Sequence, residues 1–139
     1  MRPQSYTEGD DFSSNIGITK FDSYGIYTNI NGIAVGSKYN VAVNVTNIPN
    51  IASEWHHFSL TYDGKNIILY VHDTEGNLIK SNQKPYPNHL INETSSDLYI
   101  GRLYSGYIDE IAIYDEALSE EQIKDHIIDP GIFKWYLFN

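Results

Sequence analysis

The chain has 139 residues, of which 41% are hydrophobic and 14% aromatic, with twelve tyrosines and no cysteine. That length fits one domain, and the hydrophobic content is enough for a core and argues against disorder. The formal net charge of −9 disfavours nucleic acid and anionic membrane surfaces as partners, because both attract basic proteins. The lack of cysteine excludes disulfides, thiol nucleophiles and cysteine-based zinc sites.

The first fifteen residues are polar and are predicted to be irregular. The opening MRPQSYTEGDD has no apolar stretch and does not resemble a secretory signal peptide. No segment is as long and apolar as a transmembrane helix, so we expect no membrane insertion. Three settings stay open at this point: the cytosol, a fragment of a longer exported protein, and a particle such as a virion.

From residue 15 onward, short stretches of alternating apolar residues predict strands. The expected strands cover residues 16–19, 24–30, 33–37, 39–46, 55–62, 66–73, 78–80, 97–102 and 107–114. Asn31-Gly32 and Asp63-Gly64 predict tight hairpins, and residues 74–77 predict a third turn. Residues 47–53 and 81–96 are expected to be loops.

Residues 119–128 predict one short helix. Ser119 and Gln122 form a capping box, and Leu118, Ile123 and Ile127 follow at helical spacing. The apolar residues 131–139 are expected to form a last strand or a buried plug. Many short strands with one helix predict a single all-β domain, an antiparallel β-sandwich of the jelly-roll type.

Two stretches carry a family resemblance. The segment EWHHFSLTYDGKNIILYVHD (54–73), followed by DLYIGR (97–102) and GYIDEIAIYDEALSEEQI (106–123), resembles laminin-G-like domains of the concanavalin A-like lectin/glucanase superfamily. The resemblance implies a non-catalytic module that binds carbohydrate or a glycosylated or protein surface, as in adhesion. It also implies an extracellular or surface-exposed position, in a longer protein or a viral particle.

The sequence departs from the family pattern in one large respect. The family usually has several strands upstream of a segment like residues 1–40, and one of them lies beside the closing strand. We therefore expect residues 107–114 to need another neighbour, either residues 132–138 or a strand from a second subunit or partner chain. The alternative function that follows is a structural protein that self-associates through sheet edges.

The sequence argues against a glycan-cleaving hydrolase. Glucanases of this broad fold carry paired acids in a Glu-x-Asp-x-(x)-Glu arrangement, which places a nucleophile beside an acid. The closest run, residues 109–115, lacks that arrangement. Adjacent residues on a strand point to opposite faces, so His56 and His57 are not expected to bind one metal together.

The candidate sugar-binding residues are aromatic or basic, since aromatic faces stack on sugar C–H surfaces: Tyr24, Tyr27, Arg102, Tyr104 and Tyr107. Each is also compatible with an ordinary sheet position. The resemblance further implies a calcium ion at Asp109, with Asp10, Asp11, Asp22 and Asp97 as weaker ligand candidates. The alternative is that Asp109 braces a bulge by accepting backbone N–H groups.

Overall fold

The computed structural model describes residues 2–3, 16–20, 23–29, 31–38, 41–87, 94–102, 104 and 106–128. Its strands are β1 (Arg2–Pro3), β2 (Ile16–Lys20), β3 (Tyr24–Asn29), β4 (Ile33–Lys38), β5 (Val41–Val45), β6 (His57–Tyr62), β7 (Asn66–His72), β8 (Leu78–Pro85), β9 (Leu98–Ile100) and β10 (Gly106–Tyr107), and its helix is α1 (Glu120–Ile128). The prediction that residues 1–15 are irregular is wrong at Arg2 and Pro3, which form β1, and residues 4–15 lie outside the described residues. Residues 131–139, expected to be a last strand or plug, also lie outside them.

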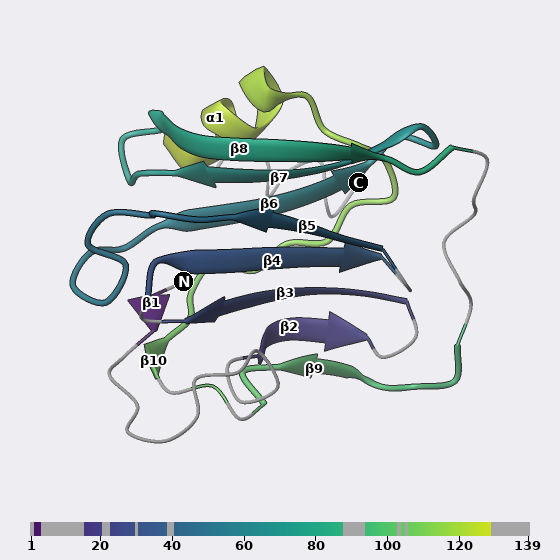
Figure 1. Ribbon diagram of the computed structural model, residues 1–139, viewed down its shortest axis with the longest axis horizontal. Coiled ribbons are helices and arrows are strands. Elements are labelled where there is room, and N and C mark those ends of the chain that lie inside the picture. Colours follow the sequence, from purple (N-terminus) through teal and green to yellow (C-terminus); the bar gives the residue numbers. More distant parts are fainter. Residues whose placement is uncertain are drawn as a thin grey trace.

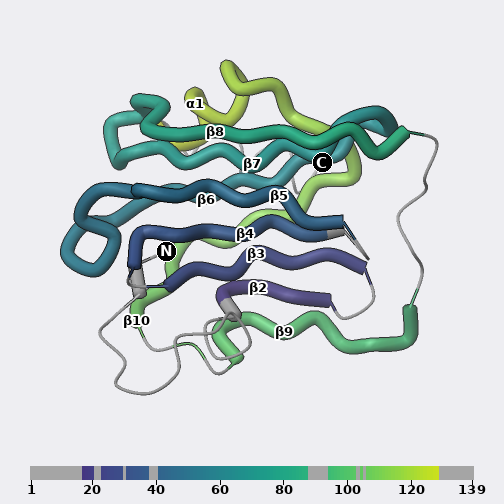
Figure 2. Tube along the Cα trace, in the orientation of Figure 1, coloured from purple at the N-terminus to yellow at the C-terminus, as the bar shows by residue number. Residues whose placement is uncertain are grey.

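Eight of the described strands form two antiparallel sheets that pack against each other, and β1 and β10 form a separate two-stranded ladder (Figure 1). One sheet has the order β5-β4-β3-β2-β9, and the other has the order β6-β7-β8. Figure 2 shows β9, from late in the chain, beside β2, and the pairing of Ile18 with Ile100 fixes their register. The prediction of an all-β antiparallel sandwich with one short helix is therefore confirmed.

The hydrophobic core lies where the three-stranded sheet covers β4 and β5. Strand β7 contacts both of these strands, and β8 contacts β5. The main core residues are almost fully buried aliphatic side chains: Ala34, Val43, Val45, Ile67, Leu69 and Val71. A Cβ atom added at Gly36 of β4 would collide with Leu60 of β6, so the two sheets approach closely at that glycine.

The two sheets also meet along one side of the sandwich. The amide of Asn82 on β8 donates to the carbonyl of Asn44 on β5 over 2.8 Å. Strand β8 was expected to end at residue 80, but it continues to Pro85 and pairs with β7 throughout. The prediction missed residues 81–85 because their side chains are exposed and polar, so no alternation marks the strand.

The predicted hairpins are confirmed, although their loops are longer than two residues. Asn29 pairs with Ile33, and Gly32 has a φ of 77°. In the next hairpin, Asp63 accepts hydrogen bonds from the backbone N–H groups of Lys65 and Asn66, each over 2.8 Å. These bonds lower the pKa of Asp63, with Asn66 contributing most, because they favour the ionised carboxylate.

The predicted strand 107–114 is wrong beyond Tyr107. Only Gly106 and Tyr107 are in a strand, and they pair with Pro3 and Arg2. Residues 108–119 form no strand, and Glu110 has a left-handed φ of 51°. The strand beside this closing segment is β1, whereas residues 132–138, one of the two neighbours expected for it, lie outside the described residues.

The short helix has the cap that the sequence predicts. The backbone N–H of Ser119 donates to Oε1 of Gln122 over 2.8 Å, and the N–H of Gln122 donates to Oγ of Ser119 over 3.2 Å. Ile123 and His126 are the buried residues of α1. Among the described residues, no helix is long and apolar enough to span a membrane.

Candidate functional site

An exposed pair of aromatic rings lies at one end of the sandwich. Trp55 precedes β6, and Tyr107 ends β10; their ring centroids are 6.3 Å apart with an interplanar angle of 46°. The two side chains are 39% and 51% exposed, which is high for such large apolar groups. Two adjoining exposed rings provide a platform for stacking against an apolar ligand face.

Hydrogen bonds brace the loop that leads to Trp55. Within the loop before Trp55, the side-chain amide of Asn50 donates to the Glu54 carboxylate over 3.2 Å, and both side chains are exposed. The loop rests on the β3–β4 hairpin, because the N–H of Ile48 donates to the carbonyl of Gly32 over 2.9 Å. The residue directly before Trp55 thus carries an exposed carboxylate that is bonded to an amide.

The structure does not bring the five candidate sugar-binding residues together. Tyr24 is half-buried in the wall of the space between the sheets. Tyr27 is also half-buried, and its hydroxyl lies 3.1 Å from Oγ1 of Thr19. Of the five, Tyr107 packs its ring against that of an exposed aromatic residue, Trp55.

Arg102 and Tyr104 lie in the segment that leads from β9 to β10. The Arg102 guanidinium stacks over the Tyr99 ring, 4.8 Å from its centroid, which is a cation–π contact. Tyr104 is half-buried, and its backbone N–H donates to the carbonyl of Gly101 over 3.1 Å. Figure 1 shows β10 at the same end of the molecule as the loop between β5 and β6.

Trp55 was missed as a candidate because the sequence pattern assigned it to a strand. Residues 55–62 alternate, and the alternation predicts that residues 56, 58, 60 and 62 form the apolar face of a strand. The observed strand begins two residues later, at His57, so Trp55 stays in the loop. The position of Trp55 directly before a hairpin strand is the sequence feature that could have indicated a loop residue.

The predicted calcium ligand Asp109 bonds to a backbone N–H group, which is the alternative role expected for it. Its carboxylate accepts a hydrogen bond from the N–H of Glu110 over 2.8 Å, at the residue with positive φ. Within the described ranges, no group of three or more His, Asp or Glu side chains is arranged to hold a metal. Asp10, Asp11 and Asp22 lie outside the described residues, and Asp97 is exposed. Calcium binding at Asp109 therefore stays a prediction.

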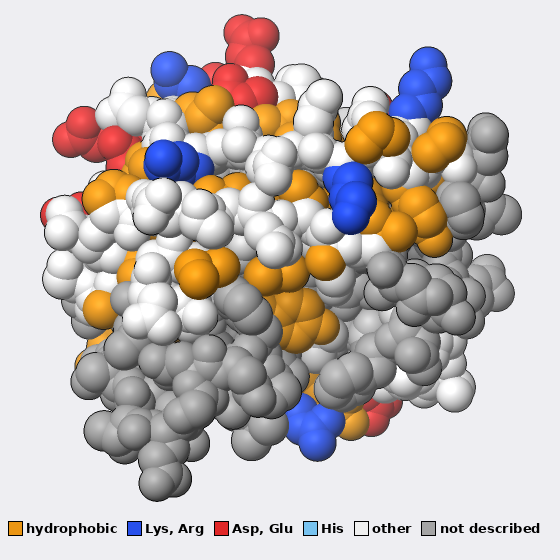
Figure 3. All heavy atoms as spheres, in the orientation of Figure 1, with side chains coloured by type: hydrophobic (Ala, Val, Ile, Leu, Met, Phe, Trp, Pro, Cys, Tyr) orange, Lys and Arg blue, Asp and Glu red, His pale blue; other side chains and the backbone are white. Residues whose placement is uncertain are grey.

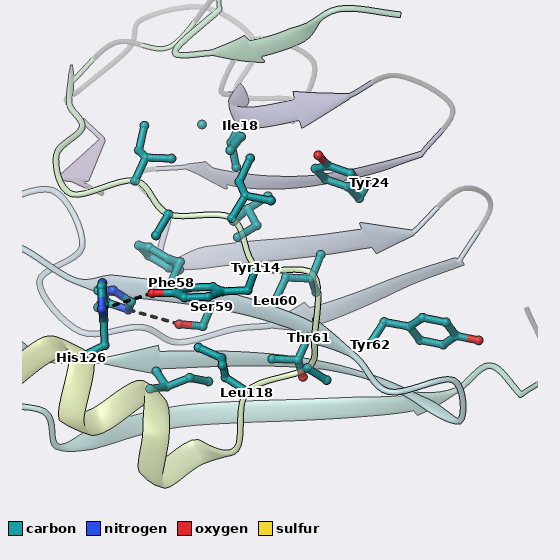
Figure 4. A pocket seen from close by; sticks show the side chains of 18 of the residues that line it. Ile18, Tyr24, Phe58, Ser59, Leu60, Thr61, Tyr62, Tyr114, Leu118 and His126 are labelled. Carbon is teal, nitrogen blue, oxygen red and sulfur yellow. Dashed lines mark hydrogen bonds between the residues drawn. The ribbon is translucent and has the colours of Figure 1, made fainter. Parts of the chain in front are cut away.

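A cavity of about 390 Å³ lies between the sheets, beside the core. Its walls are β2 and β3 on one side, β6 on another, and residues 108–118, which cross over the opening (Figure 4). Most of the lining is apolar, including Ile26, Phe58 and Leu118. This chemistry suits apolar groups better than sugar hydroxyls.

Three histidines that the sequence separates come together under α1. Nε2 of His72 lies 2.7 Å from the Glu120 carboxylate, and Nδ1 of His126 lies 3.2 Å from the Tyr114 hydroxyl (Figure 4 shows the latter bond). The rings of His57 and His126 are 6.1 Å apart. Sequence spacing gave no sign of this cluster, because β6, β7 and α1 meet only in the folded chain.

The cluster includes a contact between a serine and a histidine, but its electrostatics disfavour catalysis. Oγ of Ser59 lies 3.2 Å from Nδ1 of His57. Burial, followed by the nearby His126, lowers the pKa of His57 from 6.5 to about 4. Such a ring is a weak general base at neutral pH, since an effective base has a pKa near the working pH.

On the face shown in Figure 3, the described Lys and Arg side chains stand apart from one another instead of forming a patch. With a net charge of −9, this distribution gives no electrostatic footprint for nucleic acid on that face. Acidic side chains also project from the same face.

Comparison with known proteins identifies the family. Residues 4–124 match the family model described as the concanavalin A-like lectin/glucanases superfamily, and the chain belongs to this superfamily. No curated protein and no solved structure matches the chain. The fold, the family and the exposed aromatic platform are therefore the basis for assigning a function.

Proposed function

We propose that this protein is a non-catalytic module that binds carbohydrate, or a glycosylated protein surface, through Trp55 and Tyr107. The observation that carries the proposal is the exposed ring pair, 39% and 51% accessible, at one end of a lectin-type sandwich. The setting we propose is a surface-exposed or exported assembly, within a longer protein or a particle. Partner binding, rather than turnover, is the role.

The chemistry of the platform fits a neutral saccharide. Pyranose rings present C–H faces that pack on aromatic rings, while their hydroxyls need donors and acceptors at the rim. Glu54, which directly precedes Trp55, provides a carboxylate, and the amide of Asn50 donates to it. The net charge of −9 repels sulfated and other strongly anionic glycans, so neutral sugars are favoured.

A glycan microarray tests this proposal, with Trp55→Ala and Tyr107→Ala as site variants. We expect the wild-type protein to bind a set of neutral glycans and each variant to lose at least roughly tenfold in affinity, about 1.4 kcal/mol. Leu78→Ala is the matched control, because Leu78 is 47% exposed but lies on β8, away from the platform. An empty array, or site variants that bind like the control, contradicts the proposal.

A second candidate function is a structural one, assembly through a sheet edge. It is favoured by β6, which pairs with β7 alone among the described strands. The other edge of that sheet, β8, carries Lys80, Lys84 and Pro85, residues that discourage edge pairing. Static light scattering tests this function. If the chain self-associates, the measured mass exceeds that of one 15.9 kDa chain.

A further inference from the structure

The hairpin between β3 and β4 contains the one Asn-Gly pair of the sequence, Asn31-Gly32. Every other asparagine inside the chain precedes a residue with a side chain, most often Ile or Val, whose branched Cβ crowds the backbone nitrogen. Glycine has no Cβ. The nitrogen of Gly32 is therefore the least hindered for attack on the side-chain amide of the residue before it, which is the first step of deamidation.

The side-chain amide of Asn31 is accessible in the fold. Asn31 is exposed, and its own backbone N–H donates to Oδ1 of Asn29 over 3.0 Å. In the part of the chain that the structure describes, no hydrogen bond holds the side-chain amide of Asn31. By contrast, the side-chain amide of Asn77 donates to Asp73 over 2.9 Å. The Asn31 amide can therefore turn towards the next backbone nitrogen more easily than that of Asn77.

The hairpin at Asp63-Gly64 provides an internal comparison, because an Asp-Gly pair can form the same cyclic intermediate. Asp63 is also exposed, but its Oδ1 accepts from the backbone N–H groups of Lys65 and Asn66, each over 2.8 Å. These bonds, with that of Asn66 first, lower the pKa of Asp63 and hold its carboxyl in place. Since an ionised carboxylate is a poor electrophile, the fold protects Asp63 but not Asn31.

We propose that Asn31 is a site of spontaneous deamidation in the folded protein, with the Gly32 nitrogen as nucleophile and water as co-reactant. The nitrogen bonds to Cγ of Asn31 and loses its proton, and the side-chain amide leaves as ammonia, which gives a cyclic succinimide. Water then adds to one ring carbonyl and a ring C–N bond breaks. Breaking the bond to Cγ gives aspartate. Breaking the bond to the main-chain carbonyl carbon gives isoaspartate, whose main chain is one carbon longer.

The place of the hairpin connects this reaction to the aromatic platform. The N–H of Ile48 donates to the carbonyl of Gly32 over 2.9 Å, and a Cβ added at Gly32 would lie 2.8 Å from the carbonyl oxygen of Ile48. The loop that continues from Ile48 leads to Trp55. An added main-chain carbon shifts Gly32 against Ile48, so isoaspartate displaces this loop. The resulting loss of glycan binding rests on the proposed function, whereas the reaction itself does not.

Peptide mapping of the full chain tests the reaction. The protein is kept in warm, mildly alkaline buffer made with heavy-oxygen water and then digested, and electron-transfer fragmentation distinguishes aspartate from isoaspartate. We expect Asn31 to take up solvent oxygen at least roughly tenfold faster than Asn77 and to give mainly isoaspartate, while Asp63 isomerises more slowly. Conversion of Asn31 only in urea-unfolded protein, or no faster than that of Asn77, overturns the proposal.

Two variants separate the new charge from the longer main chain. Asn31→Gln places the amide one carbon further from the nitrogen and should resist conversion. Asn31→Asp carries the negative charge of the products, from −9 to −10, on an ordinary main chain. We expect the isoaspartate fraction, isolated by anion exchange, to bind neutral glycans at least roughly tenfold more weakly than fresh protein, and Asn31→Asp to bind like fresh protein. Equal weakening in both overturns the role of the longer main chain.

A readout without ligand keeps this test independent of the proposed function. In a Trp135→Phe background, Trp55 is the single indole of the chain. We expect its emission to shift in the isoaspartate fraction but not in Asn31→Asp. If no glycan binds to fresh protein, the proposed function fails, while peptide mapping and this shift still decide the deamidation site and its effect. An unchanged emission in the isoaspartate fraction contradicts the displacement of the loop.

Discussion

At the scale of single residues, two glycines with the same backbone conformation have different surroundings. Gly32 and Gly64 have φ angles of 77° and 89°, a region that costs other residues about 1–2 kcal/mol. A Cβ added at Gly32 would lie 2.8 Å from the carbonyl oxygen of Ile48, whereas nothing lies within 4 Å of one at Gly64. Comparing alanine variants at Gly32 and Gly64 therefore separates the cost of backbone strain from the cost of a steric collision.

We expect Gly64→Ala to lower the free energy of unfolding by about 1 kcal/mol, through strain alone. Gly32→Ala should cost at least about 1 kcal/mol more, because the loop that carries Trp55 rests on this hairpin. Urea denaturation of the two variants measures the difference. Equal losses would show that Ile48 does not hold the loop against the hairpin.

His57 makes stability depend on pH. Its pKa of about 4 in the fold is below the ordinary 6.5, so the unfolded chain takes up a proton first as the pH falls. Stability is therefore complete above pH 6.5 and decreases towards pH 4, by about 3 kcal/mol from this residue. Asp63 affects stability in a lower pH range. Its pKa in the fold is below the ordinary value of 3.8, so its contribution to stability is lost as the pH falls below 3.8.

His57→Gln should flatten this profile. The variant cannot take up a proton, so the free energy of unfolding should change little between pH 6.5 and pH 4 from this position. Thermal unfolding across that range, for wild type and variant, is the measurement. A variant whose profile runs parallel to that of the wild type would place the origin of the pH dependence elsewhere.

At the scale of elements, α1 is tied to the sheet by one side chain that the capping pattern did not reveal. Glu120 accepts from His72 of β7 over 2.7 Å, and His72 is fully buried. Glu121, its neighbour in the first helical turn, is exposed. The two carboxylates share the favourable position near the helix N-terminus, so they differ mainly in the contact with His72.

We expect Glu120→Ala to cost about 1–3 kcal/mol, because it leaves a buried ring nitrogen without its partner. Glu121→Ala should cost less than about 0.5 kcal/mol, as for most surface changes. Chemical denaturation gives the loss of stability, and amide exchange in residues 120–128 shows whether α1 loosens. Similar losses in the two variants would show that the contact with His72 does not anchor the helix.

The elements that the sequence predicted well are those with local signals. Ser119 with Gln122 gave the helix start, and Asp63-Gly64 gave a hairpin, because capping and turn chemistry depend on neighbouring residues. Residues 111–114 alternate between exposed and half-buried side chains like a strand yet form none, since a ladder needs a neighbour and sequence pattern does not supply one. Residues 81–85 show the converse, a strand made by pairing without apolar side chains.

At the scale of the whole molecule, the architecture was predictable and the site only in part. The order of the family segments was enough to indicate the sandwich, which the match over residues 4–124 supports. Tyr107 was among the five candidates, but its ring partner Trp55 comes from a loop more than fifty residues away in sequence. Which aromatic side chains meet depends on how the loop between β5 and β6 lies against β10.

The central claim, that Trp55 and Tyr107 form a carbohydrate platform, is tested most directly by the fluorescence of Trp55 itself. The chain has two tryptophans, so Trp135→Phe leaves Trp55 as the single indole reporter. On titration with a neutral glycan that binds on the array, we predict a saturable change in emission that Tyr107→Ala weakens by at least roughly tenfold, about 1.4 kcal/mol. A glycan that binds by calorimetry while the Trp55 emission stays constant would contradict the account.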